Sequence, residues 1–102
     1  MIYSLIEYRI KEPSETWERE VLAFIQAIDG DPSLRGRISY RCLKQQDGVS
    51  FCHLAAASDE SAVEELKRKP FFKPYSERLR AVAESGPKFT KLAVIGGTAI
   101  QL

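Results

Sequence analysis

The apolar residues of this chain change along its length from the two-residue period of a strand to the 3.6-residue period of a helix, and the order of these changes limits the possible folds. The first segment, Ile2–Ile10, is rich in β-branched and aromatic residues and carries large apolar groups on both faces. A helix is predicted next, with Ser14 as its N-cap. The apolar stripe of this helix consists of Trp17, Val21, Phe24, Ile25 and Ile28.

Two further strands are predicted at 37–46 and 49–57, joined by Asp47-Gly48. An Asp-Gly pair between alternating segments is typical of a two-residue hairpin turn. The register of that hairpin places Cys42 opposite His53, on the face that also carries Tyr40. We therefore expect the only histidine of the chain to face the helices.

The rest of the sequence predicts a second helical region and a last strand. Ser58 is the predicted cap of a helix that ends at Lys69-Pro70, and a further helical stretch begins at Pro74. The last strand is predicted at 88–95. This order predicts one α+β domain over residues 1–102, a ferredoxin-like βαββαβ antiparallel sheet with its helices on one face.

Such a sheet leaves its other face open, and here that face is apolar. A patch of this kind is usually covered by another surface, and a second copy of the same sheet is the simplest cover. We therefore expect a homodimer. The predicted open face consists of Tyr3, Leu5, Leu43, Cys52, Leu54, Leu92 and Val94.

Composition argues against several classes of partner. Fifteen Lys and Arg against fourteen Asp and Glu give a formal net charge of +1, which supplies no long-range attraction to nucleic acid or to an anionic membrane. No apolar run approaches the ~20 residues of a membrane-spanning helix. The N-terminus lacks the pattern of a signal peptide. We expect a cytoplasmic protein with no nucleic-acid or membrane partner.

The sequence resembles the antibiotic-biosynthesis-monooxygenase-like family of dimeric α/β barrels over nearly its whole length. The resemblance implies a homodimeric barrel, and for the cofactor-free members it implies oxygenation of phenolic polycyclic substrates. It supports the fold better than the reaction, because none of the matching positions is a catalytic motif. The matching positions are Pro13-Ser14, Gly36, Tyr40, Phe51, the segment 58–62 and the segment 69–73.

Several positions depart from this family. Many relatives end the third strand with a Glu and a Trp, where this chain has Ala55 and Ala57. The haem-degrading branch has an Asn, a Trp and a haem-ligating His, where this chain has Tyr8, Leu66 and Ser76. We therefore expect neither haem nor any other cofactor.

His53 and Cys42 offer little for catalysis or metal binding from sequence alone. A Cys–His pair is conceivable, but no Asn or Asp that could orient it is evident, so a structural His53 is the favoured interpretation. One His and two Cys at this spacing do not form the usual zinc set. Because Cys42 and Cys52 face opposite sides of the sheet, we also expect no disulfide between them.

Aromatic residues could line a pocket between sheet and helices, although aromatic stripes at this spacing are also typical of a core. The leading hypothesis is a cofactor-independent monooxygenase of a small aromatic or polycyclic substrate, with Tyr8, Tyr40 and His53 as polar anchors. The alternative is a non-catalytic protein of the same fold that binds a ligand or a partner. The candidate pocket residues are Tyr8, Trp17, Tyr40, His53, Phe72 and Tyr75.

Overall fold

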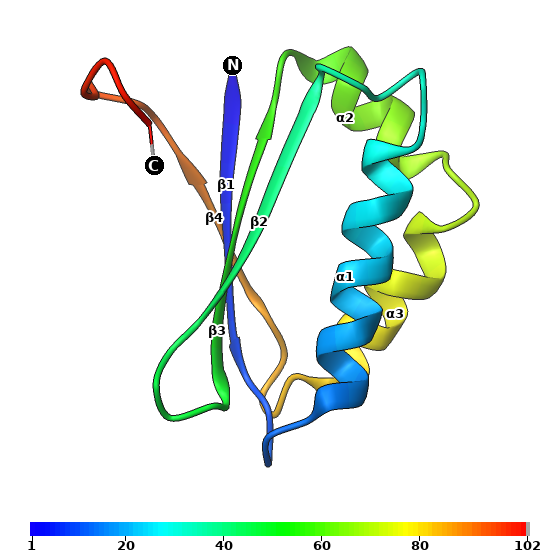
Figure 1. The fold of residues 1–102 in the computed structure, drawn as a ribbon, viewed down its shortest axis with the longest axis vertical. Helices are drawn as coiled ribbons and strands as arrows, with labels where there is room; N and C mark the ends of the chain where they lie inside the picture. The colour runs from blue at the N-terminus through cyan, green and yellow to red at the C-terminus, as the bar shows by residue number, and fades with distance from the viewer. Residues whose placement is uncertain (102) are drawn as a thin grey trace.

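Four antiparallel strands form one sheet, and three helices pack on one of its faces (Figure 1). The computed structural model describes residues 1–101. The strands lie in the order β2-β3-β1-β4, as in a ferredoxin-like sheet, which confirms the predicted fold class. In chain order the elements are β1 (Ile2–Arg9), α1 (Glu15–Asp29), β2 (Ile38–Lys44), β3 (Ser50–Ala57), α2 (Glu60–Lys67), α3 (Phe72–Val82) and β4 (Lys88–Leu92).

Strands β1 and β3 form the centre of the sheet. Strand β1 pairs with β3 on one side and with β4 on the other, so that Ile6 lies opposite His53. Alternate residues of β1 point toward the helices, and of these Ile6 and Tyr8 are buried. The central strands therefore carry the side chains that pack against the helices.

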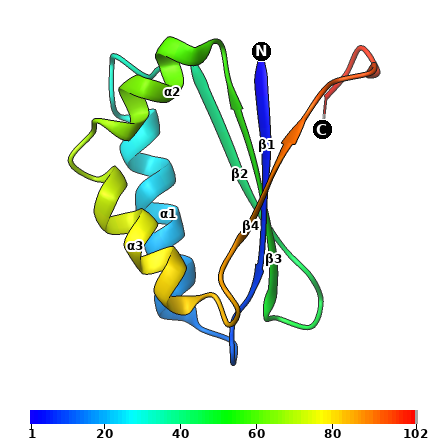
Figure 2. The same cartoon turned by 180° about the vertical axis from the view of Figure 1, so that it is seen from behind.

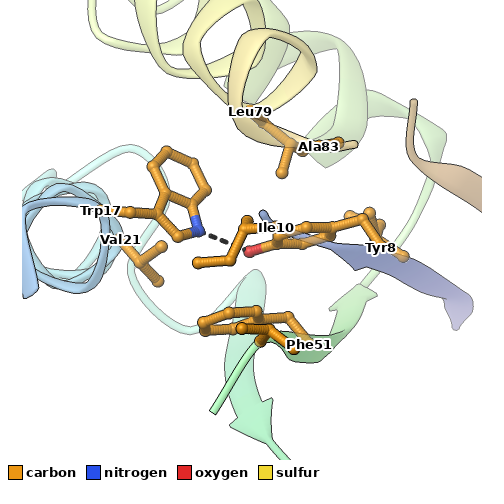
Figure 3. Packing of buried hydrophobic residues seen from close by; sticks show 9 residues of the cluster. Tyr8, Ile10, Trp17, Val21, Phe51, Leu79 and Ala83 are labelled. Atoms are coloured by element: carbon orange, nitrogen blue, oxygen red, sulfur yellow. Dashed lines mark hydrogen bonds between the residues drawn. The ribbon is translucent and has the colours of Figure 1, made fainter. Parts of the chain in front are cut away.

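Helix α1 begins and packs as its sequence predicts. The Ser14 hydroxyl accepts a hydrogen bond from the backbone N–H of Trp17, which satisfies one of the free donors at the helix start. Glu15 and Glu18 place negative charge in the first turn. Trp17 is fully buried, and its indole lies against Tyr8 in the core (Figure 3).

The hairpin between β2 and β3 has the predicted register but a longer loop. Cys42 lies opposite His53, as expected. The last backbone hydrogen bond between the two strands joins Gln45 and Ser50, however, so the loop comprises residues 46–49 and the predicted two-residue turn is wrong. The Asp47 carboxylate explains the longer loop, because its Oδ1 accepts from the backbone N–H groups of Val49 and Ser50.

Three other boundaries differ from the sequence-based expectations. Helix α3 begins at Phe72, two residues before the expected start at Pro74. Asp59, and not Ser58, caps α2, because its carboxylate accepts a hydrogen bond from the N–H of Ala62. A carboxylate one residue further along reaches the free donors of the helix start and also suits its dipole. The last strand ends at Leu92 instead of Ile95, since β4 pairs with β1 only up to that residue.

The second face of the sheet carries no helix in the part of the chain that the structure describes (Figure 2). Leu43 and Leu92 on this face are 47% and 39% exposed. Val94, predicted for the same face, lies beyond the end of β4 and is 61% exposed. The expected apolar face is therefore present, although Val94 is not within a strand.

Candidate functional site

A cavity of about 200 Å³ lies between the helix-covered face of the sheet and helices α2 and α3. Its lining is almost entirely apolar and includes Ile6, Leu66 and Leu79. The hydroxyl-bearing lining residues are Ser4, Tyr40, Tyr75 and Ser76, and Lys67 also lines the cavity. This composition, with few polar groups in an apolar wall, is that of a site for a small hydrophobic molecule.

Small residues on β3 contribute to this space. Ala55 and Ala57 point toward the helices, and both line the cavity. These are the two positions where the sequence departs from the Glu and Trp of the family that it resembles. Two methyl groups fill far less volume than those side chains would, so the departure contributes open space instead of chemistry. The run of alanines is visible in the sequence. Whether it leaves a cavity depends on the size of the side chains that face it from the helices, which the sequence alone does not give.

A buried hydrogen-bonded network lies behind one wall of the cavity and centres on His53. The Tyr8 hydroxyl is 2.7 Å from His53 Nε2, and it accepts a hydrogen bond of 2.8 Å from Trp17 Nε1 (Figure 3). On the other side of the ring, His53 Nδ1 is 2.6 Å from the Tyr40 hydroxyl and 3.3 Å from the Tyr75 hydroxyl. The two hydroxyls are 3.0 Å apart. The network thus connects α1, three strands and α3.

Aromatic packing holds this network in place. The Tyr75 ring stacks on Phe24, with ring centroids 3.8 Å apart, and is nearly parallel to Trp17 at 5.7 Å. Tyr8 stacks on Phe51 at 5.2 Å. Because these rings are fixed on both sides, their hydroxyls have little freedom to turn away from His53.

The groups of the network are uncharged at neutral pH. Burial lowers the pKa of His53 from 6.5 to about 4, so its imidazole is neutral. Burial also raises the pKa of Tyr8, Tyr40 and Tyr75 above the ordinary value, so their hydroxyls keep their hydrogens. The network is therefore a set of neutral donors and acceptors, and the charged side chain among the described residues of the cavity wall is that of Lys67.

The structure divides the six candidate pocket residues into two groups. Tyr40, Phe72 and Tyr75 line the cavity. Tyr8, Trp17 and His53 do not line it, and they form the buried half of the network. Tyr8, Trp17, Tyr40, His53 and Tyr75 are thus joined by hydrogen bonds, whereas Phe72 contributes only apolar surface.

Cys42 takes no part in the network although it lies opposite His53. Burial raises the pKa of its thiol to about 11, so it is not an activated thiolate. Both cysteines are free thiols.

Within residues 1–101, no group of three or more His, Cys, Asp and Glu side chains is arranged to hold a metal ion. No helix in the same range is long and apolar enough to cross a membrane.

An ion cluster that sequence reasoning missed supports the cavity from outside. Lys69 Nζ lies 3.0 Å from Asp31 Oδ2 and 3.3 Å from Glu65 Oε1, and it also contacts Ser33 Oγ. These contacts connect the turn between α2 and α3 to the loop after α1, and so help to hold the turn that leads into Phe72. The two acids lie far apart in sequence, so only the pair Glu65 and Lys69, which are four residues apart, could have been anticipated.

The fold and the site together define a ferredoxin-like α+β protein with an apolar cavity between its sheet and helices. No protein-family model matches the chain, and no curated protein is similar to it in sequence. Solved structures do match. SnoaB, a cofactor-independent oxygenase from Streptomyces nogalater, is similar with a TM-score of 0.76 and 15% identity, covering 97% of both chains.

Two other solved structures share this fold. An antibiotic biosynthesis monooxygenase matches with a TM-score of 0.67 and 13% identity over 94% of this chain and 100% of its own. A dimeric ferredoxin-like protein of unknown function from a Jannaschia species matches with a TM-score of 0.65 and 18% identity over 91% and 98%. The resemblance in the sequence is therefore confirmed for the fold, which is the fold of these antibiotic-biosynthesis-monooxygenase-like structures.

Proposed function

We propose that this chain is a homodimer that binds a small aromatic molecule in the cavity and oxygenates it with O₂ without a cofactor. The observation that carries the proposal is the apolar cavity whose polar wall is a pair of tyrosines backed by His53. The description of SnoaB as a cofactor-independent oxygenase supports the reaction class.

The size of the cavity limits the ligand. Drug-sized ligands occupy pockets of roughly 300–1,000 Å³, whereas a cavity of about 150 Å³ accommodates benzene. The cavity here, at about 200 Å³, suits one or two fused rings. We therefore propose a one- or two-ring substrate, which is smaller than the polycyclic substrates that the family resemblance implies.

A cofactor-free oxygenation requires the substrate to supply the electrons. When a phenol is converted to a quinone, one atom of O₂ enters the ring carbon para to the hydroxyl, and the other leaves as water with the hydrogen of that carbon and the hydroxyl hydrogen. The protein then needs to hold the substrate, exclude water and stabilise the charge that develops on it. We assign the binding of a developing oxyanion to the hydroxyls of Tyr40 and Tyr75, although Lys67 also lies on the cavity wall.

The alternative is binding without catalysis, and one observation favours it. None of the described residues that line the cavity is His, Asp, Glu or Asn, so the imidazole and carboxylate groups most often used as general bases do not stand on its wall. His53 lies behind Tyr40, and its lowered pKa makes it a weak base. In this reading the same cavity stores or carries an aromatic molecule unchanged.

Incubation with 1-naphthol and related reduced one- and two-ring compounds under ¹⁸O₂ separates the two functions. A product that carries one ¹⁸O atom, formed only in the presence of the protein, supports oxygenation. Binding without such a product supports the alternative. Ala55→Leu should remove both binding and turnover because the longer side chain fills the cavity, whereas Ala93→Leu, an exposed position, should leave both unchanged.

The homodimer is proposed from the apolar second face of the sheet. Leu5, Leu54 and Leu92 on this face are at least partly exposed in the single chain. The similar Jannaschia protein is described as dimeric. A partner sheet packed on this face would cover the patch and leave the cavity free, because the cavity lies on the helix side.

A further inference from the structure

Tyr8 does not line the cavity, yet it controls the hydrogen bonds of a group that reaches the cavity wall. Its hydroxyl oxygen accepts from Trp17 Nε1, an indole N–H that can only donate. The hydroxyl hydrogen of Tyr8 therefore needs another acceptor. Among residues 1–101, His53 Nε2 lies in reach at 2.7 Å.

This contact selects one of the two neutral forms of His53. If Nε2 accepts from Tyr8, the single ring hydrogen of His53 is on Nδ1. Nδ1–H then donates toward Tyr40 at 2.6 Å, with Tyr75 at 3.3 Å. In the opposite form, Nε2–H would donate to Tyr8, and the Tyr8 hydroxyl hydrogen would be left unpaired beside the stacked ring of Phe51. Each form leaves one hydroxyl hydrogen over, but with hydrogen on Nδ1 that hydrogen belongs to Tyr40 or Tyr75, which line the cavity and can reach water or a ligand there, whereas Tyr8 does not line it. An unpaired donor in the core is unfavourable, so the form with hydrogen on Nδ1 is preferred.

The direction of these bonds decides what the cavity offers to a ligand. With Nδ1 as a donor, Tyr40 and Tyr75 have no acceptor on His53, and only one of the two hydroxyl hydrogens is used between them. One hydroxyl hydrogen of this pair is left over, and both residues line the cavity. With Nδ1 as an acceptor, both hydrogens would instead be used within the network.

We propose that Tyr8 is a positioning residue that fixes the direction of the hydrogen bonds through His53 and thereby makes the cavity a hydrogen-bond donor to its ligand. The ligand that fits is an aromatic molecule with an accepting oxygen, such as a ring ketone or an oxyanion. This inference rests on the proposed function, because it assumes that the cavity binds an aromatic molecule. It adds which polar group of that molecule is recognised and which remote residue sets the preference.

Two probes of nearly equal size test the preference. 1-Tetralone carries one accepting oxygen, and tetralin has the same ring system without it. Calorimetric titration of the wild-type protein should show 1-tetralone binding at least about fivefold more tightly, the effect of one hydrogen bond in a water-poor cavity. Combining Tyr40→Phe with Tyr75→Phe removes both hydroxyl hydrogens, keeps the ring that stacks on Phe24 and should reduce the ratio toward one.

Tyr8→Phe is the decisive variant because the change lies outside the cavity. Without the Tyr8 hydroxyl, the two forms of His53 become similar in energy, and the affinity ratio should fall at least about twofold. Tyr3→Phe removes a hydroxyl from the other face of the sheet and should leave the ratio unchanged. A purely structural role of Tyr8 would weaken both probes equally.

Nitrogen NMR of the unliganded wild-type protein reads the form of His53 directly and does not depend on any variant folding. The inference requires hydrogen on Nδ1, and hydrogen on Nε2 would overturn it. Equal affinity of the wild type for the two probes would also overturn it while leaving the proposed function standing. Binding of neither probe would overturn the proposed function, and this inference with it.

Discussion

Tyr8 and His53 lie on adjacent strands but not directly opposite each other, and their side chains meet across a diagonal of the sheet at 2.7 Å. Tyr8 pairs with Phe51, and His53 pairs with Ile6. Diagonal neighbours on one face are within reach of long aromatic side chains. The contact gives the buried, neutral imidazole of His53 a hydrogen-bond partner, so the free energy of unfolding should depend on whether His53 is protonated.

Stability should depend on pH through His53. Its pKa in the folded chain is about 4, below the 6.5 of the unfolded chain, so the unfolded state binds more protons between these values. The contribution of a neutral His53 is therefore complete above pH 6.5 and is lost as the pH falls toward 4. Urea unfolding should show a decrease of about 3 kcal/mol in the free energy of unfolding over this range.

Assignment of this effect is simple because the chain has one histidine. The decrease in the free energy of unfolding between pH 6.5 and 4 should be absent in His53→Asn, whatever the absolute stability of that variant. A slope of the same size in the variant would show that carboxylates, and not His53, cause it. Asp47, whose pKa the Ser50 hydroxyl and nearby backbone N–H groups lower to about 2, titrates below this window.

Trp17 should be among the most costly residues to truncate. Its side chain is fully buried, and its ring contacts those of Tyr8 and Tyr75. Trp17→Ala should reduce the free energy of unfolding by roughly 3–5 kcal/mol, as for other large core truncations. Truncation of exposed Leu22 to Ala is the control and should have a small effect. A loss below about 1 kcal/mol for Trp17→Ala would contradict its place in the core.

Two neighbouring residues test the observed start of α2. Asp59 accepts the N–H of Ala62, whereas Ser58 precedes the cap. Asp59→Ala should cost about 0.5–2 kcal/mol in thermal or urea unfolding, and Ser58→Ala should stay within about 0.5 kcal/mol. The reverse order of effects would favour Ser58 as the cap.

The dimer proposal is tested on the open sheet face. Leu54→Arg places a charge in the middle of this face and should produce a monomer of 11.5 kDa or aggregate. Leu22→Arg, on an exposed position of α1, should leave the mass in sedimentation at twice that value. Sedimentation of the wild type as a monomer at micromolar concentration would contradict the proposal.

The strands and the pairing of β2 with β3 could be predicted from the sequence because short segments of the chain determine them. The alternation of β1 and the Asp47-Gly48 pair define which residues face the helices, and the pairing of Cys42 with His53 follows from the hairpin alone. The exact loop was missed because the Asp47 side chain replaces backbone hydrogen bonds. Such side-chain contacts are not encoded in the spacing of apolar residues.

The site is less accessible to sequence reasoning. All six candidate residues lie at the cavity or in the network, but their connections depend on the register between β1 and β3, which no short turn defines. Tyr75 enters from α3, 22 residues away from His53 in sequence. The cavity exists because some of the side chains between the sheet and the helices are small. Its volume can be estimated only when the positions of the strands and helices that face each other are known.

Titration of the ¹⁵N-labelled protein with 1-naphthol tests most directly whether the cavity is the binding site. We expect the largest amide shifts at Ala55, Leu66 and Ser76, which line the cavity from β3, α2 and α3. Shifts at Leu5 and Leu43, on the other face of the sheet, should be small. The largest shifts on that face, or no shifts up to millimolar ligand, would contradict the account.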